Sequence, residues 1–422
     1  MWNRSIVCLA LLSALTCLSP ARLDAAIFLV TTVAADGEGS FKRALEDANA
    51  APGPDLVLFA SELTGVVDLS GVSLPAVTES VEIVGPGAGR LAVDGGLARR
   101  VLSFGGPAES TYSMLDLTVQ RGRVGSVGDR SGQSRGGGIR LESGTLVLEN
   151  VALRDSVALG AGEGGGVYVD GGAFLRLVRC VVTRNQASSG GGIYAAGDVT
   201  VEKSTLSANV AEAEGAGLFG AGTVRLFEST LSGNRAVGSG LPTGRGGGVF
   251  IDKPGLLIAS HATLVDNRAL SGPGISSRGT VGSVSASIIA RNLETDTGLE
   301  RNCESSLGPA DANNLSGDMS CGFSGASDLE GVDPELWPLL RLGGSTPTHV
   351  PRPGSPVIDA AGTAFCIELD QRDAPRPSDG DGSGVAECDI GAVEFTAETD
   401  GGLVFVDGFE SGDVSSWSGQ FP

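Results

Sequence analysis

Residues 190–209 read GGGIYAAGDVTVEKSTLSAN, with a glycine triplet at the start and an asparagine at the end. Between them, apolar side chains such as Val199 and Val201 stand at every second position, which is typical of one face of a β-strand. The pattern returns at intervals of 25 to 31 residues, with glycine-rich triplets that start at Gly136, Gly164, Gly190, Gly215, Gly246 and Gly272. The closing Leu/Val/Ile-x-x-Asn signals end at Asn185, Asn209, Asn234, Asn267 and Asn292, and Ser156 takes this place in the first repeat.

Each repeat is too short for a βαβ unit and contains two or three short strand signals, so we predict one coil per repeat. Equivalent strands would then stack in parallel at about 4.8 Å. Asparagines at one turn position can pass hydrogen bonds from coil to coil as a structural ladder. Glycine triplets suit a bend where a Cβ would clash or φ must be positive. The sequence therefore predicts an all-β fold, a right-handed parallel β-helix over residues 56–292. A propeller would need longer repeats, and leucine-rich repeats lack this glycine signature.

Both ends of such a solenoid need covering, because open coil edges promote aggregation. Residues 40–51 predict a helix with Phe41, Ala44, Leu45 and Ala48 on one face and Ser40 as its N-cap. We assign residues 27–55 to this N-terminal cap. After Asn292 the glycine rhythm stops, and residues 293–396 are predicted to form an irregular C-terminal cap.

The chain begins with a short polar start, an apolar run and a small-residue cleavage region, which predicts a signal peptide over residues 1–26 and hence export. No other stretch has the ~20 apolar residues that a membrane-spanning helix needs. The net charge is −21, so a phosphate backbone would be repelled and nucleic acid is not an expected partner. The acidity fits either the solubility of a secreted protein or calcium binding.

Four cysteines cluster after the repeats, and disulfides are expected in an exported protein. Their closeness in sequence favours Cys303 with Cys321 and Cys366 with Cys388, although four cysteines allow three pairings. Cys180 would remain a free thiol, and its place in a column of small inward residues predicts that it is buried and inert.

One segment resembles the first half of a calcium loop. Asp379, Asp381, Ser383 and Glu387 place oxygen atoms around glycines, but Ile390 stands where the loop's bidentate glutamate is expected. A tentative calcium site and a flexible acidic turn are therefore both open at this position.

The repeats show no clear set of catalytic residues. One outward column contains residues of both charges, which predicts surface ion pairs, and His261 in this column is expected to be a solvated surface histidine. The carboxylates whose columns cannot be aligned stand in the early coils and are Asp68, Asp94, Glu109 and Asp116.

Several motifs resemble known bacterial families. The repeat signals at 190–194 and 206–209 resemble those of polymorphic outer-membrane proteins and bacterial right-handed β-helix repeat proteins. The pairs TT at 31–32, DG at 36–37 and SF at 40–41, with ANA at 48–50, are similar to a CSLREA-type N-terminal region. Residues 346–349, 353–359, 370–372 and 388–394 resemble the choice-of-anchor Q domain. The resemblance implies a secreted or surface β-helix protein and brings no established reaction.

Residues 397–422 are predicted to be a linker followed by a short tail, which is similar to tails on many exported proteins of Gram-negative bacteria. The resemblance implies that the tail serves in sorting or attachment. A disordered acidic end is the alternative. The predicted function is a non-catalytic extracellular or outer-membrane role in adhesion, glycan or surface binding, or envelope structure, with a polysaccharide or a cell-surface glycan or protein as partner. The alternative is a polysaccharide lyase or glycoside hydrolase with its groove on the early coils.

Overall fold

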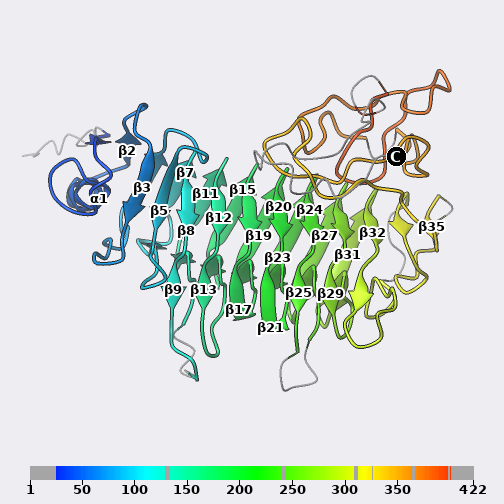
Figure 1. The fold of residues 1–422 in the computed structure, drawn as a ribbon, viewed down its shortest axis with the longest axis horizontal. Coiled ribbons are helices and arrows are strands. Elements are labelled where there is room, and N and C mark those ends of the chain that lie inside the picture. Colours follow the sequence, from blue (N-terminus) through cyan, green and yellow to red (C-terminus); the bar gives the residue numbers. More distant parts are fainter. Residues whose placement is uncertain are drawn as a thin grey trace, which may run out of the picture.

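The structure is a computed structural model that describes residues 25–128, 134–238, 244–307, 312–325, 327–363, 366–397 and 400. Nearly all of the predicted signal peptide, and residues 401–422 of the predicted tail, lie outside the described residues. The described chain forms a right-handed parallel β-helix built from four sheets (Figure 1), so the predicted fold class is confirmed. Among the described residues, no helix is long and apolar enough to cross a membrane.

Four sheets, here named A to D, run along the solenoid. Sheet A contains β1 (Ile27–Val30), β2 (Asp55–Phe59), β4 (Val81–Val84), β7 (Thr111–Leu115), β11 (Thr145–Glu149), β15 (Phe174–Val178), β19 (Asp198–Glu202), β23 (Thr223–Phe227), β27 (Leu256–Ser260) and β31 (Thr280–Ser285). Sheet B contains β3 (Gly65–Asp68), β5 (Leu91–Asp94), β8 (Thr118–Gln120), β12 (Ala152–Arg154), β16 (Val181–Thr183), β20 (Thr205–Ser207), β24 (Thr230–Ser232), β28 (Thr263–Val265), β32 (Ile288–Ala290), β34 (Leu315–Ser316) and β35 (Leu329–Glu330).

The two remaining sheets have shorter strands. Sheet C contains β6 (Leu102–Phe104), β10 (Ile139–Leu141), β14 (Val167–Val169), β18 (Ile193–Ala195), β22 (Leu218–Gly220), β26 (Val249–Ile251) and β30 (Ile275–Ser277). Sheet D contains β9 (Arg123–Val124), β13 (Val157–Ala158), β17 (Gln186–Ser189), β21 (Val210–Glu214), β25 (Arg235–Ala236), β29 (Arg268–Ala269) and β33 (Leu293–Glu294). One regular coil passes from sheet C through A and B to D, as in β18, β19, β20 and β21.

The core consists of like residues stacked on like residues. In sheet A, Leu146 lies opposite Leu175, Leu175 opposite Val199, and Val199 opposite Val224. All of these side chains are fully buried. Parallel register at one coil per repeat therefore converts a sequence period into a continuous apolar column.

The predicted asparagines lie in one buried ladder. The side-chain oxygen of Asn209 accepts from the backbone N–H of Asn185 at 3.0 Å and from its amide at 3.1 Å, and Asn234, Asn267 and Asn292 repeat this contact. Each amide also donates to the backbone of an earlier coil, as Asn209 does to the carbonyl oxygen of Val182. Asn302 extends the ladder by one position.

The glycine triplets meet two separate requirements. The first glycine has a positive φ in every triplet, for example 65° at Gly190. At the third position a Cβ would touch the next coil, because one placed on Gly192 would lie 2.5 Å from the carbonyl oxygen of Gly217. Glycine is therefore needed for conformation at one position and for space at the other.

The N-terminal end is covered by α1 (Phe41–Ala50), which packs on β1 and β2. The Ser40 hydroxyl accepts from the backbone N–H of Arg43 at 3.2 Å, and the rings of Phe41 and Phe59 lie 4.9 Å apart. The stacking extends beyond residues 56–292 in both directions, because β1 pairs with β2 and β34 with β32.

Residues 332–363 and 366–397, here called the C-terminal segment, fold back along the later coils and lie against their side (Figure 1). Three threonines on the outer face of sheet B contact it. Thr205 donates to the carbonyl oxygen of Pro347 at 2.6 Å, and Thr230 donates to the side-chain oxygen of Gln371 at 2.6 Å. Thr263 accepts from the backbone N–H of Ala392 at 3.0 Å. This arrangement leaves the outer face of the earlier coils uncovered by the segment.

The disulfides join Cys303 to Cys321 and Cys366 to Cys388, the pairings that proximity in sequence favours. Cys180 is free and buried, and burial raises the pKa of its thiol to about 12. Such a thiol remains protonated at neutral pH and is a poor nucleophile.

Candidate functional site

A groove lies on the outer face of sheet B, across β8, β12 and β16, where the C-terminal segment stops. Its volume of about 580 Å³ is in the range of small-ligand sites. The lining residues are Ala88, Gly89, Asp116, Thr118, Asn150, Val151, Ala152, Arg154, Arg179, Val181, Thr183, Arg184, Arg341 and Ser345.

The floor of the groove follows from strand alternation. Val119, Leu153 and Val182 point inward and are buried, so their neighbours in sequence point outward. Thr118, Ala152 and Val181 form one outward column, and these small side chains leave the sheet hollowed at this point. Arg154 and Thr183 form the second outward column. In the later coils the C-terminal segment covers the same columns.

The walls come from turns and from the distant C-terminal segment. In each coil one residue with positive φ turns the chain from sheet A to sheet B, and Asp116, Asn150 and Arg179 occupy this place beside the groove. Arg184 forms the opposite wall, and Arg341 and Ser345 bring the C-terminal segment to the end of the groove. The site therefore combines residues from several coils with one segment that is remote in sequence.

The groove is cationic, although the chain as a whole has a net charge of −21. Four arginines and one aspartate are among the lining residues. Arg184 forms hydrogen bonds of 2.7 and 2.9 Å to Asp155, which raise the pKa of its guanidinium, and Arg179 pairs with Glu149. Arg154 and Arg341 have no carboxylate partner among the described residues. Two permanent positive charges are thus available to a ligand.

The carboxylates of the early coils do not converge on this groove. Asp116 lines it, whereas Asp68 and Asp94 face each other in register on β3 and β5. Asp94 is buried and accepts from Gln120 at 2.7 Å, and Asp68 accepts from the backbone N–H of Ser70 at 2.9 Å, which lowers the pKa of Asp68. Glu109 is exposed in the turn before β7. Glycoside hydrolysis typically uses a pair of carboxylates across one groove, and these four carboxylates do not form such a pair in this groove.

The prediction that His261 is a solvated surface histidine is wrong. His261 is buried, and burial lowers the pKa of its imidazole to about 3. His349 is buried as well, with Nε2 2.8 Å from the hydroxyl of Ser232 and Nδ1 2.8 Å from the carbonyl oxygen of Trp337. The outward column was identified from the repeats, but the C-terminal segment that covers its later members has no periodic signal in the sequence.

Polar residues in and near the motifs at 370–372 and 388–394 form contacts within the C-terminal segment and with sheet B. Gln371 is buried and donates to the hydroxyl of Thr205 at 2.9 Å. Arg376 and Glu394 form a fully buried ion pair of 3.0 Å. The nearby carboxyl of Asp389 has a pKa raised well above its usual value, first by burial and then by the charge of Glu394. These residues hold the segment together and against sheet B.

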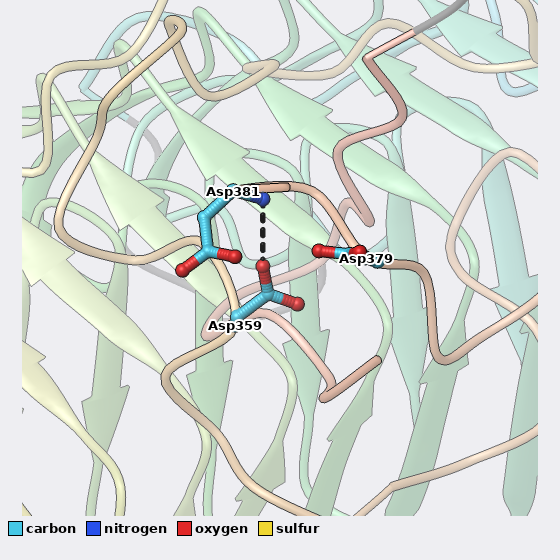
Figure 2. A group of neighbouring side chains, drawn as sticks. All are labelled: Asp359, Asp379 and Asp381. Atoms are coloured by element: carbon cyan, nitrogen blue, oxygen red, sulfur yellow. Dashed lines mark hydrogen bonds between the residues drawn. The ribbon is translucent and has the colours of Figure 1, made fainter. Parts of the chain in front are cut away.

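Three carboxylates gather in the C-terminal segment, from Asp359, Asp379 and Asp381 (Figure 2), with ligand oxygens within 4.8 Å of one another. Asp359 comes from outside the predicted loop, and no spacing in the sequence pointed to it. Ser383 and Glu387, which were predicted with this site, are not in the carboxylate group. Their backbone N–H groups donate instead, to Asp381 at 2.8 Å and to Asp359 at 3.3 Å.

Two carboxyl groups of this acidic group have pKa values shifted in opposite directions. Burial raises the pKa of Asp359, whereas the hydrogen bond from Ser383 lowers the pKa of Asp381. Carboxylate oxygens at this separation are ligands that a hard divalent cation such as calcium prefers. The group shares Asp379 and Asp381 with the predicted calcium loop and adds Asp359, while Ser383 and Glu387 stay outside it.

Sheet C has a column of aromatic rings, a type of surface on which sugars can stack. The Tyr168, Tyr194, Phe219 and Phe250 rings follow one another at centroid distances of 5.3, 4.3 and 5.3 Å. Arg135 and Arg278 lie over the rings at the two ends of the column. Because the ring faces are occupied by one another and by the arginines, the column stabilises sheet C and leaves no ring face for a sugar.

No family model matches this chain, and no curated protein matches it by sequence. Among solved structures the chain is similar to pectate lyase Pel9A, at 14% identity and a TM-score of 0.46, over 88% of this chain and 96% of that chain.

A groove on the early coils was one of the alternatives from the sequence, but its full lining could not be predicted. Arg154 and Val181 are visible as outward positions of their repeats, but Arg341 and Ser345 stand far away in sequence. Their place beside β16 depends on the docking of the C-terminal segment through contacts such as Thr205 to Pro347, which join residues 142 positions apart.

Proposed function

We propose that this chain is an exported, non-catalytic β-helix protein of the cell surface or extracellular space, and that it binds a glycan in the groove over β8, β12 and β16. The observation that carries the proposal is the groove itself, which combines a hollowed strand face, cations without carboxylate partners and a single carboxylate. Export is supported by the two disulfides, since disulfides persist in oxidising compartments. Adhesion or an envelope role would follow from such binding.

The alternative activity is polysaccharide degradation in the same groove. A glycoside hydrolase needs two carboxylates at opposite sides of the scissile bond, and the lining supplies Asp116 alone. A lyase would need a positioned base, for which an always-charged arginine is poorly suited without a further change in its environment. The lining therefore favours binding over turnover.

The test uses the mature chain with a glycan array and a panel of acidic and neutral polysaccharides. We expect saturable binding without the release of shorter products. Val181→Trp should abolish binding, because the indole would fill the floor of the groove. Val147→Trp is the matched control, since Val147 is an outward, half-buried valine on sheet A.

Two results would contradict the proposal. Product release that Asp116→Asn abolishes would identify an enzyme. Glycan binding that Val181→Trp leaves unchanged would place the ligand elsewhere on the molecule.

A further inference from the structure

The groove contains two arginines, Arg154 and Arg341, that no carboxylate among the described residues neutralises. Most of the molecule repels anions, since acidic residues outnumber basic ones by 50 to 29. Four arginines nevertheless line this groove, with Arg154 on β12, Arg179 and Arg184 in the turns at the two ends of β16, and Arg341 in the C-terminal segment. Clefts lined by one sign of charge concentrate ligands of the opposite sign. We propose that the groove recognises the carboxylate groups of an acidic saccharide, with Arg154 and Arg341 as the carboxylate-binding residues; this inference rests on the proposed glycan-binding function.

The four arginines are not equivalent. Glu149 and Asp155 already neutralise Arg179 and Arg184, so these two cations offer little net attraction. Arg154 projects from β12 between Gln120 and Thr183 on the neighbouring strands, and its Nε is buried without a hydrogen-bond partner. This buried Nε is out of reach of a ligand, but a guanidinium keeps its charge at neutral pH. Because Arg154 lines the groove and has no carboxylate partner among the described residues, its positive charge is available to an anion bound there.

The shape of the guanidinium favours a carboxylate as this anion. Arginine presents its donors in a planar fork that matches the two oxygens of a carboxylate. Asn150, Thr183 and Ser345 add neutral hydrogen-bonding groups beside the cations. Charged donors next to amide and hydroxyl groups match a saccharide that carries both carboxylates and hydroxyls.

An acidic peptide fits this site less well. Extended peptides commonly add to a free sheet edge, where backbone groups are unpaired. β12 is an interior strand that pairs with β8 on one side and β16 on the other, so its backbone groups are already used. The groove therefore offers side chains and no strand edge.

The groove is also short along the solenoid axis. The turn at Ala88 and Gly89 limits it on one side, and Arg341 and Ser345 limit it on the other. Three stacked strands span about 10 Å between their outer axes. The groove can therefore contact only a few sugar units. This length agrees with one carboxylate bound at Arg154 and one at Arg341.

The experiment titrates the mature chain with hexagalacturonate, with its methyl ester and with hexaglutamate as probes. We expect saturable binding of hexagalacturonate that weakens with added salt, and no measurable binding of the neutral ester. Arg154→Gln and Arg341→Gln should each reduce the affinity by about 10-fold or more, the loss typical of a charge-assisted contact. Arg225→Gln is the matched control, because Arg225 lies outward on sheet A without a carboxylate partner among the described residues.

The possible outcomes separate this inference from the proposed function. Equal binding of the acid and its ester, or full affinity in both arginine variants, would overturn carboxylate recognition. Binding that Val181→Trp abolishes would then still support a glycan groove. Hexaglutamate binding as tight as that of hexagalacturonate would overturn the saccharide in favour of an acidic peptide. Because Arg154 and Arg341 belong to separate parts of the fold, one variant remains informative if the other does not fold.

Discussion

The side-chain oxygen of Asn234 accepts two hydrogen bonds from Asn209, one from its backbone N–H and one from its amide, both at 3.0 Å. Both residues are fully buried. A single oxygen thus satisfies two donors from the preceding coil, and the amide that bears this oxygen donates to Leu206 at 2.9 Å. Asn234 in turn donates to the side-chain oxygen of Asn267 in the following coil, from its backbone N–H at 3.0 Å and from its amide at 2.9 Å, so it is linked to the coils on both sides.

Replacing Asn209 with Leu should destabilise the solenoid strongly. The change removes the acceptor for two donors of Asn185, and each buried group left without a partner costs about 1–3 kcal/mol. We expect the free energy of unfolding in urea to fall by at least about 2 kcal/mol. Gln186→Leu is the control, because Gln186 also has an amide side chain near the ladder but is exposed. An equal effect of both variants would mean that the ladder adds no special stability.

The ladder could be predicted from the sequence, because a residue in one coil lies on its equivalent in the next. The same logic identified the inward columns at Leu146 and Leu175. It could not place the C-terminal segment, because the residues of the segment that contact the threonine column of sheet B, namely Pro347, Gln371 and Ala392, follow no repeat. Burial of His261 and the approach of Arg341 to β16 both depend on that docking. The contact between Asp359 and Asp379 depends on how the segment itself folds.

Gly192 provides a separate test of coil stacking. Its φ is not in the left-handed region, so Gly192→Ala introduces a steric problem without a conformational one. The new Cβ would lie 2.5 Å from the carbonyl oxygen of Gly217, and overpacking of this kind costs about 1–3 kcal/mol. We expect a lower thermal midpoint for this variant. Gly171→Ala, where a Cβ would meet no atom within 4 Å, should leave the midpoint unchanged.

Calcium binding at the three aspartates can be measured through stability. Sites of extracellular modules bind calcium with a Kd of about 0.1–1 mM. At a Kd of about 1 mM, 10 mM calcium would stabilise the folded chain by about 1.4 kcal/mol. We expect calcium to raise the thermal midpoint, a chelator to reverse the rise, and Asp381→Asn to remove it. Asp296→Asn changes an exposed aspartate elsewhere and should keep the response. A response equal in both variants would indicate non-specific screening of the acidic surface.

His349 should make the docking of the C-terminal segment sensitive to acid. Burial lowers the pKa of His349 to about 4, from the usual 6.5, so the folded state binds its proton more weakly than the unfolded state does. Its contribution to stability is therefore complete above pH 6.5 and is lost as the pH falls toward 4. The Asp266 carboxylate, 3.9 Å from Nε2, and Arg291, which pairs with Asp266 at 3.0 Å, are the charged groups that face it.

His349→Gln isolates this effect, because an amide can accept from Ser232 and donate to Trp337 as the neutral imidazole does. Between pH 7.5 and 4.5, the free energy of unfolding of the wild-type chain should fall by on the order of 2 kcal/mol more than that of the variant. Carboxylates titrate in the same range, but they do so in both proteins, and the difference between the two pH profiles belongs to the histidine. Parallel profiles would show that His349 can be protonated without weakening its contacts, and the acid sensitivity would then have to come from other groups such as His261, whose pKa burial also lowers.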